Sequence, residues 1–127
     1  MIKKLFINVN LCVKICELVR KKLTERRTQM VNHIVMWKFK PEIEESSKSE
    51  LKKTMNEQLS GLVGKVPGLL TATFVENPLA SSTHDIALVT TLEKAEDIAV
   101  YATHPAHVYV ADNFVRPYVT ERACLDY

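Results

Sequence analysis

Four stretches of residues 30–127 have the composition expected of β-strands. They cover residues 31–40, 69–77, 85–92 and 116–127, and the first three are rich in β-branched or aromatic side chains. In the first stretch, VNHIVMWKFK, alternate side chains point to opposite faces, and both faces are apolar in the middle. A strand of this kind is covered on both sides. We therefore expect a sheet with helices over one face and a second sheet against the other.

Helical spacing fills the two longer intervals between these strands. Apolar residues recur every three or four positions over residues 51–66, and residues 47–50 (SKSE) have the pattern of a capping box. Residues 93–102 are expected to form a second helix that ends before Pro105, which suits the first turn of a further helical piece because its missing N–H is not needed there. The resulting order, β-α-β-β-α-β, is the ferredoxin-like α+β arrangement with a four-stranded antiparallel sheet.

Charge divides the chain at about Met30. The full chain of 127 residues has a net charge of +2. Residues 1–29 hold eight Lys or Arg and two Glu (8 − 2 = +6), whereas residues 30–127 hold nine basic and thirteen acidic groups (9 − 13 = −4). Nucleic-acid binding depends on clustered Lys and Arg, so the mildly acidic domain is not expected to bind nucleic acid.

Residues 1–29 form an extension before a domain that covers residues 30–127. Apolar positions over residues 11–23 follow helical spacing and basic residues lie mostly on the other side, which predicts a basic amphipathic helix. Asn8, Asn10 and Lys14 interrupt the apolar run, which argues against a secretory signal or a membrane span. Two interpretations stay open. The segment is either an upstream or mobile appendage, or a helix that contacts an anionic membrane or a partner, and membrane contact is expected only through it.

Three cysteines do not make a disulfide framework. Cys12 and Cys16 lie one helical turn apart, and Cys124 lies near the other end of the chain. A sparse and odd set of thiols is typical of a reducing compartment, so we expect a cytoplasmic protein.

Three segments of the domain carry a recognisable pattern. They are residues 30–40 (MVNHIVMWKFK), residues 66–69 (VPGL) and residues 101–108 (YATHPAHV), the last followed by residues 116–117 (RP) and 126–127 (DY). Together they resemble the stress-responsive dimeric α/β-barrel (Dabb) domain family. The resemblance implies a homodimer in which two ferredoxin-like sheets pair across a two-fold axis to make a closed barrel with the helices outside.

Within this family, the segment around Tyr101 and His107 is similar to polyketide cyclases of the olivetolic acid cyclase type, which perform a cofactor-free aldol cyclisation. The resemblance implies that His107 and Tyr101 are catalytic and that His33 lies in the pocket. An imidazole can remove a proton next to a carbonyl near neutral pH, and a hydroxyl can bind the developing oxyanion. Two positions depart from the cyclases: Ile86 replaces a further pocket histidine, and Trp37 replaces a smaller aliphatic residue.

The predicted ligand pocket surrounds Tyr101 and His107. Its remaining lining is expected to come from His33, Val35, Trp37, Ile86, Leu88 and His104. Two of the histidines also have a structural alternative: His107 can pack under the sheet, and His104 can cap the helical piece that starts at Pro105. His104 and His107 are three residues apart, but Pro105 lies between them and no third ligand follows at motif spacing, so we expect no metal and no cofactor.

Two functions of different classes fit these residues. The first is a homodimeric small-molecule-binding protein whose ligand is a small hydrophobic carbonyl compound. The second is a cofactor-independent enzyme that cyclises such a compound, or transfers a proton on it, with His107 and Tyr101. A scaffold role in larger assemblies is a further alternative. With three glycines in the chain there is no Gly-rich phosphate loop, and no serine-nucleophile motif is present, which excludes nucleotide-dependent and serine-hydrolase classes.

Overall fold

The computed structural model describes residues 12–21 and 30–127, and the chain divides into two units between Met30 and Val31. Residues 12–21 are helical and exposed, within the range over which the amphipathic spacing predicts a helix. The other residues of that predicted helix lie outside the described part of the chain. None of the described helices has the length and apolar character needed to cross a membrane.

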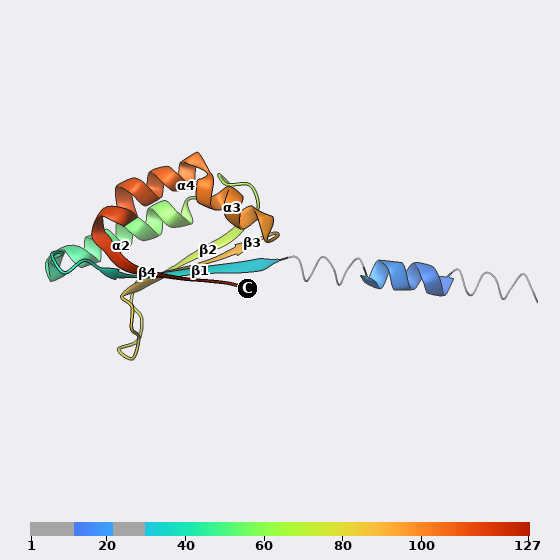
Figure 1. Cartoon of the computed structure of the whole chain (residues 1–127), viewed down its shortest axis with the longest axis horizontal. Coiled ribbons are helices and arrows are strands. Elements are labelled where there is room, and N and C mark those ends of the chain that lie inside the picture. Colours follow the sequence, from blue (N-terminus) through green and yellow to red (C-terminus); the bar gives the residue numbers. More distant parts are fainter. Residues whose placement is uncertain (1–11, 22–29) are drawn as a thin grey trace, which may run out of the picture. The chain divides into compact units, whose positions relative to one another are not determined.

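The second unit contains a four-stranded antiparallel sheet with helices on one face (Figure 1). Its elements in chain order are β1 (Val31–Phe39), α2 (Glu45–Ser60), β2 (Leu69–Val75), β3 (Ile86–Leu92), α3 (Glu96–Thr103), α4 (Pro105–Val110), a π-helical turn (Ala111–Val115), a 3-10 turn (Arg116–Tyr118) and β4 (Val119–Asp126). The strand order is β2-β3-β1-β4. This is the ferredoxin-like α+β fold, as the sequence predicts, with the second helical segment split into α3 and α4.

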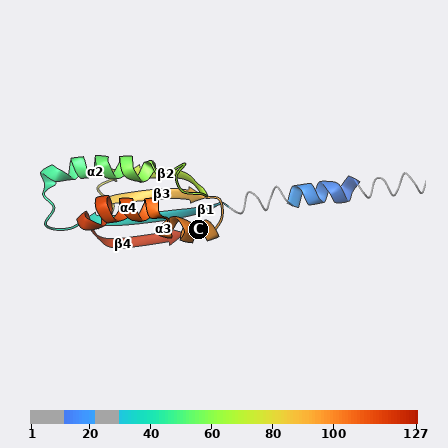
Figure 2. The ribbon, with the colours of Figure 1, turned by 90° about the horizontal axis from the view of Figure 1, so that it is seen from above.

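The alternation in β1 gives the sheet two different faces. His33, Val35, Trp37 and Phe39 are buried beneath the helices, whereas the residues between them are only partly buried. The same alternation occurs in β3, whose buried positions start at Ile86 and include every second residue to the end of the strand. Figure 2 shows from above how the helices lie over this sheet. The opposite face carries no helix of this unit.

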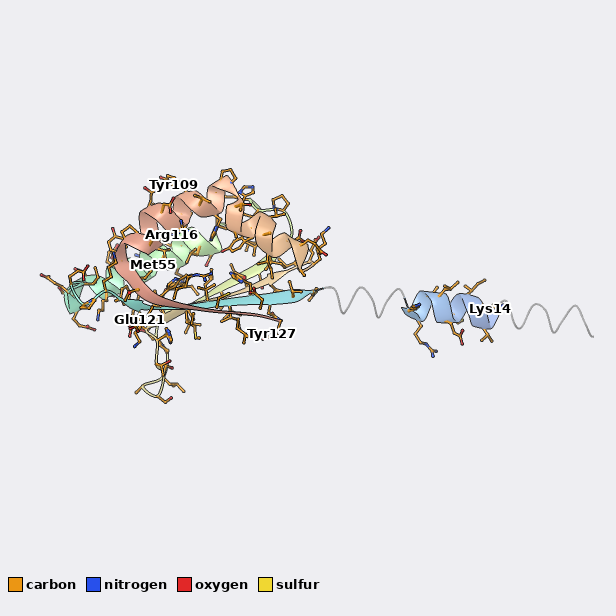
Figure 3. The ribbon with its side chains drawn as sticks, viewed as in Figure 1. Lys14, Met55, Tyr109, Arg116, Glu121 and Tyr127 are labelled. Carbon is orange, nitrogen blue, oxygen red and sulfur yellow. The ribbon has the colours of Figure 1, made fainter. Side chains whose placement is uncertain are left out.

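The core lies between the sheet and the helices. Met55 of α2 is fully buried, and Figure 3 places it between its helix and the sheet. Leu59 of the same helix and Tyr101 of α3 are each 2% exposed. Burying a large apolar side chain contributes roughly 1.5–3 kcal/mol, so this core holds the helices against the sheet.

Three predicted element starts differ from the structure by two residues or more. Helix α2 begins at Glu45, before the predicted capping box, and its N-cap Glu44 makes no side-chain capping bond, so the capping-box prediction is wrong. Helix α3 begins at Glu96 instead of residue 93. Strand β4 begins at Val119 instead of residue 116, because the preceding residues form a 3-10 turn around Pro117, which has no N–H to donate to a strand neighbour.

Candidate functional site

A cavity of about 200 Å³ lies between the helices and the sheet. Its walls come from strands β1, β3 and β4, from helices α2, α3 and α4, and from the turns that connect α4 with β4. The lining residues are His33, Val35, Trp37, Leu59, Leu88, Tyr101, Ala102, His107, Ala111, Val115, Arg116 and Arg122. The volume is below the roughly 300–1,000 Å³ typical of pockets for drug-sized ligands, so the cavity as it stands suits a small molecule.

Tyr101 places a polar group in this mostly apolar space. Its side chain is 2% exposed, and the part of the chain that the structure describes offers no hydrogen-bond partner to the hydroxyl. Burial raises the pKa of Tyr101 to about 12, so the hydroxyl keeps its proton at neutral pH. An unsatisfied buried polar group costs about 1–3 kcal/mol. The hydroxyl is therefore ready to donate a hydrogen bond to an oxygen atom that enters the cavity.

His107 lies beside Tyr101, with 4.3 Å between the ring centroids and 42° between the planes. Its Nδ1–H donates to the carbonyl oxygen of Ala102 at 3.1 Å. A carbonyl can only accept, so the neutral ring carries its proton on Nδ1 and leaves Nε2 with a free lone pair. Burial lowers the pKa of His107, although the bond to Ala102 opposes this effect. Near neutral pH the ring is therefore a neutral base.

A second imidazole, that of His33, also lies near Tyr101. The ring of His33 is 6.0 Å from that of Tyr101, at 70° in an edge-on arrangement. His33 Nδ1 is 2.5 Å from Oδ1 of Asp126, because β1 and β4 are neighbours and their register pairs these two residues. The hydrogen bond from His33 holds the pKa of the Asp126 carboxyl below its ordinary value. The carboxylate thus orients the His33 ring and keeps a proton on its Nδ1.

The structure brings together six of the eight residues that the sequence predicts for the site. They are His33, Val35, Trp37, Leu88, Tyr101 and His107. The other two do not line the cavity. Ile86 pairs with Trp37 at the start of β3 and is buried in the core at 1% exposure. His104 is the N-cap of α4, where its Nδ1 accepts a hydrogen bond from the Ala106 N–H at 3.1 Å, so its role is the capping one.

Sequence reasoning missed two cations at the cavity. Arg116 and Arg122 both line it, and both are exposed residues. Arg116 also forms an ion pair with Asp112, one helical turn earlier. The Arg116-Pro117 pair belongs to the family pattern, but the pattern gave no role to the guanidinium. Its position next to the cavity adds a positive charge there, which the Asp112 carboxylate partly offsets.

Fold and site together define a class: small α+β proteins with a ferredoxin-like sheet and a partly polar cavity beneath the helices. Residues 31–127 match the protein family described as the stress responsive A/B barrel domain, so the chain belongs to the Dabb family. Among curated proteins, none matches the sequence.

Solved structures share the fold. A dimeric protein of unknown function from Bacteroides fragilis is 28% identical with a TM-score of 0.70, over 77% of this chain and 94% of that chain. A Dabb family protein from Mesorhizobium loti is 15% identical with a TM-score of 0.61, over 78% and 95%. A hydroxynitrile lyase from Passiflora edulis is 14% identical with a TM-score of 0.57, over 78% and 92%. The last two likenesses show the fold alone.

Proposed function

We propose that the domain is a homodimeric small-molecule-binding protein whose ligand is a small, largely apolar carbonyl compound. The observation that carries this proposal is the buried Tyr101 hydroxyl, which lines a cavity and has no hydrogen-bond partner among the described residues. Val35, Trp37 and Leu88 supply apolar walls for the carbon skeleton. A carbonyl oxygen is the acceptor that would satisfy the hydroxyl inside such a cavity.

The homodimer is supported by the sheet face that bears no helix of the domain. Ile34 lies there between Val89 on β3 and Leu125 on β4, and Leu125 is 60% exposed. Pairing this face with that of a second copy would remove apolar surface from water. The relative from Bacteroides fragilis is described as dimeric, which agrees with this arrangement. A cytoplasmic location is also part of the proposal, because all three cysteines are unpaired.

Ligand binding can be tested by two-dimensional amide NMR with β-diketones and with hydrocarbons of the same size. We expect the diketones to shift the amide signals of residues around the cavity, and the hydrocarbons to bind more weakly. Tyr101→Phe should weaken diketone binding by about tenfold, which corresponds to loss of one hydrogen bond. Tyr109→Phe is the matched control, because Tyr109 is 61% exposed and lies on the outer side of α4 (Figure 3). Equal binding by both variants would contradict the proposal.

A second candidate function is a cofactor-independent enzyme with polyketide cyclase-like chemistry. The orientation of His107 favours it, because the bond to Ala102 leaves Nε2 as the basic nitrogen beside Tyr101. In this mechanism Nε2 removes a proton from the carbon next to a carbonyl, and the Tyr101 O–H donates a hydrogen bond to the oxygen of the forming enolate. The enolate carbon then attacks a second carbonyl of the same chain. The imidazolium returns its proton to the resulting alkoxide, so protons balance.

Turnover separates the two candidates. A linear poly-β-keto acid is incubated with wild-type protein, His107→Ala, Tyr101→Phe and the control Tyr109→Phe, and aromatic product is followed by absorbance and mass. The enzyme hypothesis predicts that wild type and Tyr109→Phe form product. In His107→Ala, which lacks the base, the rate of product formation should fall by about 100-fold or more. If all four samples form product only at the rate of buffer alone, the catalytic function is excluded. If the protein still binds diketones, the binding function is retained.

A further inference from the structure

Three side chains with metal-binding atoms meet beside the cavity. His33 Nδ1, Cys124 Sγ and an oxygen of Asp126 all lie within 4.8 Å of one another. Cys124 and Asp126 are two residues apart on β4 and therefore point to the same face of the sheet. The register between β1 and β4 pairs Asp126 with His33 and Cys124 with Val35, which also lie on that face. Two adjacent strands thus direct three different donor atoms towards one point.

The distances between these atoms fit a tetrahedral site. Cys124 Sγ is 3.6 Å from His33 Nδ1 and 3.6 Å from Asp126 Oδ1. In a tetrahedral zinc site, with Zn–S about 2.3 Å and Zn–N or Zn–O about 2.0 Å, a sulfur lies about 3.5 Å from its neighbouring ligand atoms. Two of the three edges therefore already have the separation that an ion requires.

The third edge is closed by a hydrogen bond. Nδ1 of His33 and Oδ1 of Asp126 are 2.5 Å apart, whereas the same pair around zinc would be about 3.3 Å apart. The difference, roughly 0.8 Å, requires the Asp126 side chain to turn and the His33 ring to carry its proton on Nε2 instead of Nδ1. The Asp126 side chain is 44% exposed, which leaves room for it to turn.

We propose that His33, Cys124 and Asp126 bind a zinc ion or a divalent cation of similar preference. One thiolate, one imidazole and one carboxylate suit zinc, whereas magnesium and calcium prefer oxygen ligands alone. Three protein ligands leave one coordination position for water or an exogenous group, as in zinc sites that take part in reactions. Because His33 also lines the cavity, the ion would stand at the edge of that cavity. Binding displaces the thiol proton of Cys124.

This site differs from the metal pair considered in the sequence. His104 and His107 were the candidates there, and the structure uses His104 as a cap and turns His107 towards Ala102. The signal for the present site is the alternation Cys124-x-Asp126 on one strand, with a histidine on the neighbouring strand. The inference does not rest on the proposed ligand-binding or catalytic function, since it is tested by metal binding itself.

The test uses the full chain, reduced and stripped of metal, with Co²⁺ as a spectroscopic probe. We expect one equivalent of Co²⁺ to bind with thiolate-to-cobalt charge transfer and the intense visible bands of tetrahedral coordination, and Zn²⁺ to displace it. The Cys12→Ser/Cys16→Ser double variant removes the other two thiols and should keep this spectrum. Cys124→Ala, at an exposed position, should lose the charge-transfer band.

Asp126→Asn provides an independent arm. Removing a residue that only orients a metal ligand typically lowers metal affinity by roughly 10- to 100-fold. If Asp126 is itself a ligand, the Co²⁺ affinity of the Asp126→Asn variant should fall by more than this. The proposal is overturned if Co²⁺ gives only weak octahedral bands, if Cys124→Ala keeps the wild-type spectrum, or if the spectrum disappears in the Cys12→Ser/Cys16→Ser variant. In that event the three residues act without a metal, with Asp126 orienting His33 through their hydrogen bond.

Discussion

The rings of Tyr101 and His107 lie 4.3 Å apart although they belong to two different helices. The break at Pro105 makes this possible. Pro105 is the first residue of α4, and the His104 side chain accepts the Ala106 N–H as its cap. A continuous helix would separate residues six positions apart by well over one turn, on different faces. Because of this break, the side chains of Tyr101 and His107 both line the same cavity.

Replacing Tyr101 with Phe should stabilise the domain. The variant removes a buried hydroxyl that has no partner among the described residues, and recovering its desolvation cost raises the free energy of unfolding by about 1 kcal/mol. Urea unfolding followed by circular dichroism measures the difference. Tyr109→Phe, at an exposed position, should stay within about 0.5 kcal/mol of wild type. A clear loss of stability in Tyr101→Phe would mean that the hydroxyl has a structural partner.

His107 should titrate at lower pH in the folded protein than in the unfolded chain. Its folded pKa lies below the ordinary value of 6.5, mainly because the ring is partly buried. The unfolded state therefore binds the proton more tightly, and the free energy of unfolding falls as pH drops from about 6.5 through the folded pKa. Well below the folded pKa, His107 is protonated in both states and causes no further fall in the free energy of unfolding. Imidazole resonances in native and urea-unfolded protein give the two midpoints.

The same NMR spectra test the tautomer of His107. The hydrogen bond to Ala102 predicts a proton on Nδ1 and an unprotonated Nε2 at neutral pH. In His107→Gln, the slope of stability against pH between the two midpoints should become shallower. A native midpoint at or above 6.5, or a proton on Nε2, would contradict the assignment of this ring as the neutral base.

Sequence periodicity was sufficient for the parts of the fold that depend on one element at a time. The alternation through Val35 and Trp37 predicts a strand with a buried face, and Pro105 predicts the helix break; the structure contains both. The family pattern also named His33, Tyr101 and His107, which the structure brings to one cavity.

Pairings between distant strands could not be read in this way. The contact between His33 and Asp126 depends on the register of β4 against β1, and that register shifts between Met36 and Lys38. A shift of one residue would turn Asp126 to the other face of the sheet, and no local spacing in the sequence shows where it occurs. The same reason explains why Cys124 and Arg122 were not predicted beside the cavity.

Gly68→Ala should be strongly destabilising. Gly68 has φ of +85°, and a Cβ there would lie 2.5 Å from Cγ of the buried Asp97. The left-handed conformation costs an alanine roughly 1–2 kcal/mol, and the overlap adds about 1–3 kcal/mol. Gly64→Ala is the matched control, because Gly64 has φ of +88° with nothing within 4 Å of the added atom. Equal losses in urea unfolding would show that the contact with Asp97 has no effect.

The open face of the sheet should control the oligomeric state. Ile34 stands at its centre, directly between Val89 and Leu125 on the neighbouring strands. A glutamate at this position would place a charge within the apolar interface of both copies, since a two-fold interface buries the same surface patch on each subunit. We therefore expect wild-type protein to have the mass of a dimer at micromolar concentration in light scattering, and Ile34→Glu to have the mass of a monomer.

The control for this substitution is Val63→Glu, which makes the same change at a position that is 40% exposed and lies outside the sheet. It should remain dimeric. Ile34→Glu should keep its helical circular dichroism, because the buried face of β1 is formed by the alternate residues His33 and Val35. If the Ile34→Glu variant is folded and still dimeric, the dimer interface does not lie on this face of the sheet. A monomeric wild type would remove the homodimer from the proposed function, while the Tyr101 cavity inside each subunit would still be open to the binding test.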